Sequence, residues 1–357
     1  MKRFIVLIAA VTAAGCVDTL VGPDPTTTPA GLFDIVWADF DRNYAAFGLK
    51  QLDWDDVRRR YAPQAAAAPS VDALAPIIGA MFRELHDPHV DLLLPNRKYY
   101  SSVDLGAVKT YFSPPAILGN YVPGSVMTPS RNIRYGKLAS DVGWIWIGSF
   151  GGDGWASEID DVLKALGNVS AVIIDVRNNG GGSTNNSEPI AARFFDEERV
   201  FSYFQYRNGP GHDDFTEVRS RTITPAGTHF GGRVVVLTNR RCVSATEGFV
   251  LAMKVQPGVQ LVGDTTAGGF GNPLTRELPN GWVYRLPQWI QYDANHRVLE
   301  DVGIAPDVVV RITAADSVAG KDPQLEKALA MARGQGVPAS LRKLLLVPAR
   351  NRSGYID

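Results

Sequence analysis

From Ala171 to Gly182 the sequence reads AVIIDVRNNGGG, an apolar run that ends in a polar, glycine-rich turn. Apolar runs of this kind are typical of a strand buried on both faces of a parallel sheet. The glycines let backbone N–H groups converge on an anion or an oxyanion at the end of the strand. A plain flexible turn uses the same residues. A phosphate loop is disfavoured, because no Gly-Lys-Ser/Thr follows.

Strands alternate with helices around this segment. Short β-branched or aromatic runs predict strands at 144–150, 171–176, 233–238, 288–292 and 307–310. Longer stretches between and after them predict helices at 155–166, 188–195, 245–255 and 323–333. Such alternation favours an α/β layered core. We place this core at residues 135–340, with 341–357 as a C-terminal tail.

Helices dominate the region before the core. Apolar and aromatic residues recur every three or four positions in residues 32–47, as in an amphipathic helix. Asp53 and Ser70 stand where caps of two further helices are expected. The resulting predictions are helices at 32–47, 54–61 and 71–85, a helical N-terminal subdomain at 31–95 and a linker at 96–134.

The first residues have the pattern of a targeting segment. Lys2 and Arg3 precede an apolar stretch, 4–14, that is too short to span a bilayer. Small residues lead directly to Cys16, which resembles the bacterial lipobox; an ordinary signal peptide that contains a Cys is the alternative. We expect a signal peptide at 1–15, lipidation of Cys16 and a Pro/Thr-rich tether at 16–30. The protein would then be anchored at the periplasmic face of the bacterial envelope, most simply at the outer membrane.

Composition excludes some classes of partner. The 357-residue chain has 45% hydrophobic and 20% charged residues, as an ordinary globular protein has. Its formal net charge of -1 provides no basic field for nucleic acid. There are two cysteines, so a lipidated Cys16 leaves Cys242 without a disulfide partner.

A second polar turn, TNRRCVSATE from Thr238 to Glu247, follows another predicted strand. Ser244 stands where a helix begins, so its hydroxyl meets the positive end of the helix dipole. Ser244 and Glu247 also have the spacing of a capping box. A nucleophile and a helix cap are therefore competing interpretations, because a hydroxyl bonded to the helix backbone is poorly placed to attack a carbonyl.

Five segments, in this order and spacing, resemble the tricorn-core and C-terminal-processing-protease family. The resemblance covers roughly residues 30 to 312. The family patterns are L-x-D-x-H, D-x-R-x-N-x-G-G, S-A-x-E, G-x-x-T-x-G and G-[VI]-x-P-D. They correspond here to Leu85–His89, Asp175–Gly182, Ser244–Glu247, Gly263–Gly268 and Gly303–Asp307.

The resemblance implies a layered core of the crotonase and Clp-protease type and a serine endopeptidase that acts on peptides or unfolded proteins. Ser244 would be the nucleophile, and no cofactor is required. The N–H of Ala245 would form the oxyanion hole with that of Gly181 or Gly180; we favour Gly181. The PDZ module of the processing proteases does not fit in residues 96–134.

The same resemblance implies the general base. Processing proteases use a Lys after G-x-x-T, but Gly269 stands at that position and Lys254 is the nearest Lys on that side. The tricorn-like branch uses a His from the helical segment, and His89 matches it. A neutral imidazole suits proton transfer near neutral pH. A structural histidine, or a metal site with His86, are the other interpretations of His89; we expect no metal.

An acid is expected to orient His89. Glu300 matches the Glu of the tricorn-like branch, but that branch has a Ser directly before its His, and Pro88 replaces it here. Asp87 is the alternative, and Glu300 is favoured by its position before Gly303. Three other functions remain open: an inactive ligand- or peptide-binding member of the fold, a crotonase-like acyl-CoA enzyme, and a peptidase with Cys242 as nucleophile. The acyl-CoA enzyme does not account for a secretion signal.

Overall fold

The computed structural model describes residues 27–335 of the chain. The predicted signal peptide, Cys16, most of the tether and the tail at 341–357 lie outside these residues. In the part that is described, no helix combines the length and apolarity needed to cross a membrane.

A seven-stranded sheet forms the centre of the larger body. Its order is β14-β10-β9-β6-β5-β4-β3, parallel from β14 to β5 and antiparallel from β5 to β3. The strands are β3 (Val126–Met127), β4 (Ile133–Ala139), β5 (Val142–Ile147), β6 (Ala171–Asp175), β9 (Arg233–Thr238), β10 (Gln260–Gly263) and β14 (Val308–Val309). All five residues of β6 are buried, as its apolar run predicts.

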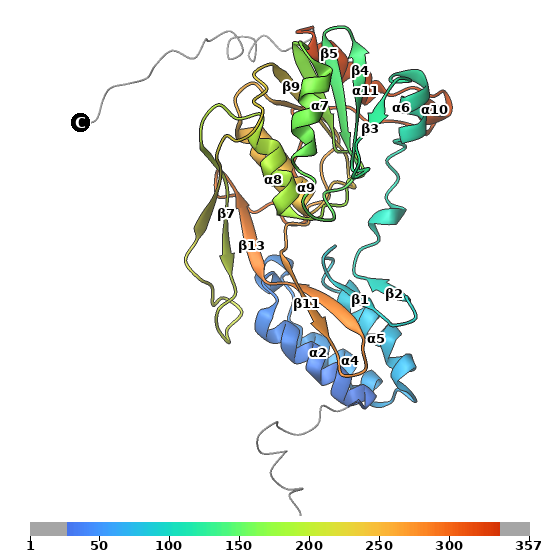
Figure 1. Cartoon of the computed structure of the whole chain (residues 1–357). Helices are drawn as coiled ribbons and strands as arrows, with labels where there is room; N and C mark the ends of the chain where they lie inside the picture. The colour runs from blue at the N-terminus through green and yellow to red at the C-terminus, as the bar shows by residue number, and fades with distance from the viewer. Residues whose placement is uncertain (1–26, 336–357) are drawn as a thin grey trace, which may run out of the picture.

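Helices cover both faces of this sheet (Figure 1). The helices α7 (Glu158–Leu166), α8 (Thr184–Ala192) and α9 (Ala245–Val255) contribute to the apolar core on one face. The helix α11 (Pro323–Ala332) packs on the other face, near the short helices α6 (Pro114–Asn120) and α10 (Ala314–Val318). The predicted α/β layered core is therefore confirmed.

The N-terminal body contains the helices α2 (Pro29–Asn43), α3 (Phe47–Lys50), α4 (Trp54–Ala66) and α5 (Val71–Arg83). Asp53 and Ser70 cap α4 and α5, accepting hydrogen bonds from the N–H groups of Asp56 and Ala73. The helix predicted at 32–47 is divided in two, because Tyr44 has extended backbone angles and ends α2. The Tyr44 hydroxyl instead donates to Asp87, 2.9 Å away.

This body also contains a sheet that the sequence did not predict. Its antiparallel order is β11-β12-β1-β2, made of β1 (Asp91–Leu93), β2 (Tyr99–Ser101), β11 (Pro273–Glu277) and β12 (Val283–Pro287). The hairpin β11–β12 supplies Trp282, Tyr284 and Leu286 to the apolar core beneath the helices. A late segment of the chain therefore completes the N-terminal body.

Residues 96–134 differ from the linker that was expected. They contain β2, a 3₁₀ turn at Leu105–Ala107, α6 and β3. The strand β2 pairs with β1, and β3 is the edge strand of the main sheet. Both are only two or three residues long, so they have no recognisable periodicity of their own.

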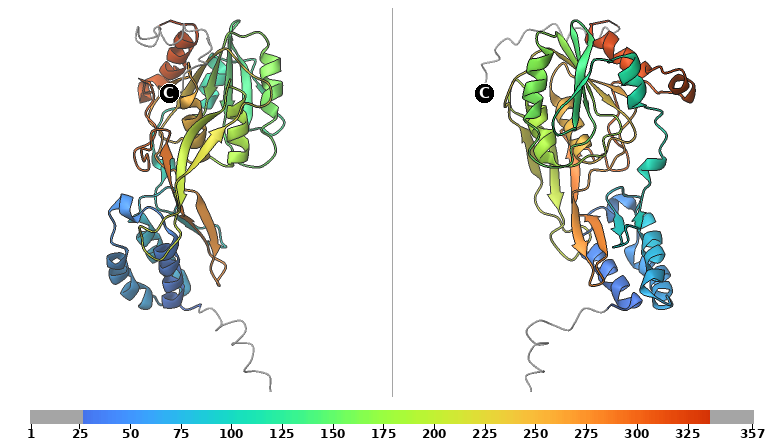
Figure 2. Two further views of the ribbon diagram at one scale, coloured as in Figure 1. Left: turned by 90° about the vertical axis from the view of Figure 1, so that its left-hand side faces the viewer. Right: turned by 45° about the vertical axis from the view of Figure 1, so that its right-hand side comes forward.

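A third sheet, β13-β7-β8, connects the two bodies. Its strands are β7 (Arg199–Tyr206), β8 (Arg219–Ile223) and β13 (Trp289–Asp293). Figures 1 and 2 show β7 and β13 running from the α/β core towards the N-terminal helices. Arg207, just after β7, donates to the backbone carbonyls of Asp41, Arg42 and Tyr44 at the end of α2. These hydrogen bonds join the third sheet to the N-terminal body.

Candidate active site

Ser244 lies at the turn between β9 and α9, immediately before the first helical residue. Its backbone has φ 63° and ψ -129°, a left-handed conformation that is strained for a residue with a Cβ. Its N–H donates to the carbonyl of Gly269, 3.0 Å away. Its side chain makes no hydrogen bond to the helix. The cap interpretation is therefore not realised, and the hydroxyl is available for chemistry.

Glu247 has a different role from the one a capping box would give it. Its buried carboxylate accepts hydrogen bonds from the Thr266 hydroxyl and from the N–H groups of Gly268 and Gly269. Burial raises the pKa of Glu247 to about 8, against these three donors and the backbone N–H of Ser244, which favour the charged form. Glu247 thus fixes the loop after β10 against the helix that begins at Ser244.

The glycine turn after β6 lies directly against the turn that contains Ser244. Gly181 has φ 93°, and a Cβ there would be 2.7 Å from the Cβ of Ser244, so only glycine fits. Its N–H, which the sequence favoured for the oxyanion hole, donates to the side chain of Asn179 at 2.9 Å. Within residues 27–335, the N–H groups of Gly180 and Ala245 have no acceptor. These two, both at the cleft, are the donors that remain.

The polar residues around these glycines hold the two turns together. Asn178 and Asn239 are joined by two hydrogen bonds: the backbone N–H of Asn178 donates to Oδ1 of Asn239, and Nδ2 of Asn239 donates to Oδ1 of Asn178. Arg177 is fully buried and pairs with Asp175 and Asp322. The polar residues of the segment Asp175–Gly182 therefore mainly stabilise the structure of the glycine turn.

His89 reaches the cleft from the N-terminal body, two residues before β1. It is 5% exposed, and neither ring nitrogen has a hydrogen-bond partner among the residues that the structure describes. Its Nδ1 lies 3.8 Å from Oδ1 of Asp87, which also accepts the backbone N–H of His89 at 2.8 Å. Burial lowers the pKa of His89, opposed by the charge of Asp87. The imidazole is therefore biased towards its neutral form.

Glu300 contacts Phe270 and Lys50 and forms no ion pair with His89 in the described residues. Its Oε2 accepts the N–H of Phe270 at 2.8 Å, and its Oε1 lies 3.7 Å from Nζ of Lys50. Glu300 and Asp87 line one small cavity of about 10 Å³. Burial, with the charge of Asp87, raises the pKa of Glu300 well above its ordinary value. Asp87, rather than Glu300, is the carboxylate beside His89.

Gly269 stands where the processing proteases have their Lys, and neighbouring residues fill the space that a side chain at this position would need. A Cβ on Gly269 would be 2.4 Å from Pro88 and 3.5 Å from Cε1 of His89. Pro88 and the imidazole therefore occupy the space that a longer side chain at 269 would need. Lys254 is ten residues along α9 from Ser244, about 15 Å by helical rise, and its Nζ donates to the carbonyl of Ala305.

Other reactive groups are held away from this chemistry. Cys242 is fully buried, and burial raises the pKa of its thiol to about 12, so it is a poor nucleophile. His86 is exposed whereas His89 is buried. In the described part of the chain, no group of three or more His, Cys, Asp or Glu is placed to hold a metal ion.

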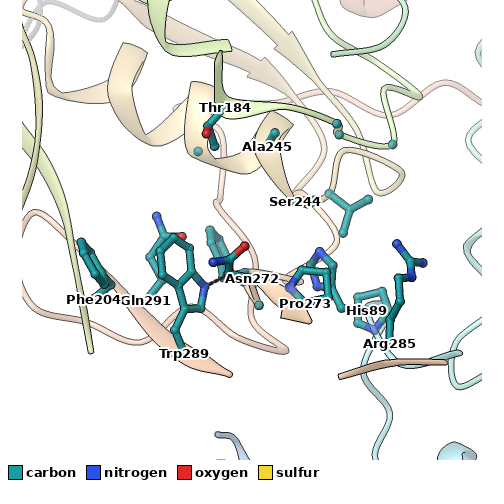
Figure 3. A pocket seen from close by; sticks show the side chains of 18 of the residues that line it. His89, Thr184, Phe204, Ser244, Ala245, Asn272, Pro273, Arg285, Trp289 and Gln291 are labelled. Carbon is teal, nitrogen blue, oxygen red and sulfur yellow. Dashed lines mark hydrogen bonds between the residues drawn. The ribbon is translucent and has the colours of Figure 1, made fainter. Parts of the chain in front are cut away.

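Ser244 and His89 open into one cleft of about 840 Å³. Figure 3 shows His89 and Arg285 on one side of Ser244, and Phe204, Gln291 and Trp289 on the other. The latter three come from β7 and β13, which are distant from Ser244 and His89 in the sequence but close to them in the fold. No motif in the sequence marked them, because their separation along the chain conceals their proximity.

Comparisons with known proteins agree with this arrangement. The sequence profile of peptidase family S41 matches residues 141–310, and that of the tricorn protease C1 domain matches residues 25–83. Tricorn protease of Thermoplasma acidophilum is 28% identical over 205 residues, which are 56% of this chain and 17% of that protein. The carboxy-terminal processing protease CtpA of Bacillus subtilis is 27% identical over 173 residues, 47% of this chain and 35% of that protein. The chain thus spans well under half the length of these two relatives.

One solved structure is similar to this chain over almost the whole length of the solved protein. It is a putative peptidase from Parabacteroides merdae, with a TM-score of 0.78 and 32% identity over 86% of this chain and 97% of that one. The photosystem II D1 C-terminal processing protease shares the fold, with a TM-score of 0.54 and 16% identity. The two profile matches and the 32% identical structure together show that the chain belongs to peptidase family S41.

Proposed function

We propose that the protein is a serine endopeptidase that cleaves peptides or unfolded proteins through an acyl-enzyme on Ser244, with His89 as general base. One observation carries the proposal. The Ser244 hydroxyl, which makes no bond to its helix, lines the same cleft as the buried His89 imidazole, whose two nitrogens have no partner among residues 27–335. Among the described residues, no hydrogen bond joins Ser244 to the His89 ring, but a nucleophile and a base that line one cleft are the two groups that covalent catalysis needs.

The reaction follows from these positions. Oγ of Ser244 attacks the scissile carbonyl carbon while Nε2 of His89 takes the hydroxyl proton. The N–H groups of Ala245 and Gly180 stabilise the oxyanion, assisted by the N-terminal dipole of α9. His89 then gives the proton to the leaving amine, and the acyl group stays on Oγ as an ester. Water, deprotonated by His89, hydrolyses this ester and restores Ser244.

Asp87 has the position of the orienting acid in this scheme. A carboxylate near Nδ1 favours the tautomer with its proton on Nδ1, which leaves Nε2 to face the nucleophile. Asp87 is itself fixed, since its Oδ2 accepts the Tyr44 hydroxyl and its N–H donates to Ser102. Glu300 supports the loop at Phe270, and Lys50 is paired with Asp301.

The cellular place of this activity is part of the proposal. The basic start, the short apolar stretch and the small residues before Cys16 support export and lipidation. The peptidase would then be anchored to the bacterial envelope at its periplasmic face.

A fluorophosphonate probe tests the nucleophile. The probe should label the wild-type protein, and peptide mass mapping should place the adduct on Ser244. The matched control is Ser157→Ala, because Ser157 is also a helix N-cap residue whose side chain makes no cap bond. We expect labelling and hydrolysis of unfolded casein to be lost in Ser244→Ala and kept in Ser157→Ala.

The same experiment separates the inactive alternative. A wild-type protein that binds unfolded peptide, yet takes no label and cleaves nothing, would be a binding member of the fold. An adduct on any other residue would reject Ser244 as the nucleophile.

A further inference from the structure

The proposed chemistry gives the cleft a direction. His89 must protonate the leaving amine, so the part of the substrate after the scissile bond lies on the side of His89 and Arg285. The residue before the scissile bond then points to the opposite side of Ser244. That side is the aromatic arm, which we define by five residues that line the cleft: Phe204, Tyr206, Trp289, Gln291 and Arg221. Figure 3 labels Phe204, Trp289 and Gln291.

The walls of the aromatic arm are built by cross-strand pairs. Trp289 pairs with Tyr206, and Gln291 with Phe204, between β13 and β7. The ring centroids of Trp289 lie 5.0 Å from Phe204 and 5.6 Å from Tyr206. The Trp289 indole N–H donates to the carbonyl of Phe270 and so fixes the ring. Rigid aromatic walls of this kind favour a large planar side chain.

The charges in the arm balance each other. Arg221 forms an ion pair with Glu188, and its guanidinium stacks 5.5 Å from the Trp289 ring. A lysine or arginine of the substrate would meet Arg221, and an aspartate or glutamate would meet Glu188. An uncharged side chain avoids both penalties.

One donor in the arm has no partner. Gln291 is 5% exposed, and its Nε2 makes no hydrogen bond in the described part of the chain. A buried amide without a partner is costly unless a ligand satisfies it. A substrate side chain that carries a hydrogen-bond acceptor would do so.

Gly248 keeps the arm open. It lies on α9 one turn after Ser244, and a Cβ there would contact only Nη1 of Arg221, at 3.9 Å. Its helical backbone needs no glycine, since its φ is negative. A side chain at 248 would therefore project into the cleft without disturbing the backbone.

We infer that the aromatic arm binds the side chain immediately before the scissile bond and selects tyrosine there. Tyrosine is large, planar and uncharged, and its hydroxyl oxygen can accept from Gln291. This inference rests on the proposed function, because the direction of the cleft comes from the roles of Ser244 and His89.

The test uses peptides that differ only at this position, with Tyr, Phe, Ala, Lys or Glu, and the full-length protein. We expect kcat/KM for Tyr to exceed that for Phe by about 3- to 10-fold, the worth of one net hydrogen bond. It should exceed that for Ala by about 10-fold or more, from burial of the ring. Gly248→Leu should lower the Tyr/Ala ratio by about 10-fold or more, and Gln291→Met should bring the Tyr/Phe ratio to about one.

The controls keep the outcomes distinct. Gly124→Leu, at a glycine with open space around it, should leave all ratios unchanged, and melting temperatures show whether each variant folds. The same peptides are titrated against Ser244→Ala by calorimetry. Selective binding of Tyr peptide without turnover in the wild type would support the arm and reject the peptidase. Turnover with a flat profile, or with a Lys or Glu preference, would overturn the arm alone.

Discussion

At the scale of single residues, the strain at Ser244 has a clear origin. The residue is held between the Gly181 turn and the Gly269 carbonyl. A relaxed N-cap serine would bond to its own helix, and the loss of one cap costs about 1 kcal/mol. Here the neighbouring turns impose φ 63° and leave the hydroxyl exposed to the cleft. The strain therefore coincides with the position proposed for the nucleophile.

The pKa of His89 determines the pH dependence of activity. Burial lowers this pKa below the ordinary value of about 6.5, so the neutral base persists into mildly acidic solution. We expect kcat/KM to rise with pH through a single transition with its midpoint below about 6.5. His89→Ala should remove the transition and most of the rate, whereas His229→Ala, at an exposed histidine, should keep both. A midpoint near 8 to 10 would indicate a lysine base instead.

The two acids near His89 can be distinguished by isosteric substitutions. Asp87→Asn keeps an acceptor for the His89 N–H and a group that can donate to Tyr44, but removes the charge beside Nδ1. We expect kcat to fall by about 100- to 10,000-fold. Glu300→Gln keeps an acceptor for Phe270 and should cost less than about tenfold. Turnover is compared between variants of equal melting temperature. A larger loss in Glu300→Gln than in Asp87→Asn would show that Glu300, which the sequence favoured, orients His89.

At the scale of elements, Glu247 links α9 to the loop after β10. In an unfolded chain its pKa would be about 4.3, whereas burial raises it to about 8 in the fold. The unfolded state therefore ionises first, and the stability contributed by Glu247 is lost as pH rises between these two values. Glu247→Gln places an amide against backbone donors and should cost about 1–3 kcal/mol at low pH.

Urea denaturation at several pH values checks this prediction. The difference in stability between wild type and Glu247→Gln should shrink as pH rises from about 4.3 to about 8. Glu277→Gln, at an exposed position of β11, is the control and should show no difference. A difference independent of pH would mean that Glu247 is ionised throughout the range.

An element could be predicted from the sequence when the pattern that produces it lies within its own residues. The helix at 245–255 and the buried strand at 171–175 were recognisable because period and apolarity are local properties. The hairpin β11–β12 was not, because its residues are buried only by packing against helices more than 200 positions earlier. The short strands β2 and β3 depend likewise on distant partners.

The site shows the same division. The Ser244 turn and the glycine turn beside it could be recognised as candidates from sequence, since each follows a strand end. The choice between Gly180 and Gly181 could not, because it depends on a hydrogen bond from Gly181 to Asn179. The order of Asp87 and Glu300 around His89 depends on how the two bodies pack.

At the scale of the whole molecule, the site is assembled from two bodies. His89 and Asp87 belong to the N-terminal body, and Ser244 and the glycine turn belong to the α/β core. Three connections fix their relative position: the hairpin β11–β12, the strand β13 that follows it, and Arg207, which follows β7 and donates to backbone carbonyls at the end of α2. The helical body therefore does more than precede the core, because it carries the proposed base.

The predicted anchor also acts at this scale. The helix α2 begins at the end of the N-terminal body that is furthest from the α/β core (Figures 1 and 2). A tether of residues 16–28, fully extended, would reach about 45 Å. An anchor at Cys16 would therefore leave the cleft beyond the helical body and accessible to protein substrates.

Metabolic labelling with palmitate tests the anchor. We expect label on the wild-type protein and partition into the membrane fraction, because covalent acyl chains supply about 0.8 kcal/mol for each buried CH₂ group. Cys16→Ala should lose the label and its membrane association, while the fluorophosphonate reaction at Ser244 should proceed at an unchanged rate, since the cleft is built from residues 88–291. Cys242→Ala is the matched control and should keep both label and membrane association. Palmitate that persists on Cys16→Ala, or a wild-type protein found only in the soluble fraction, would contradict the proposed lipid anchor.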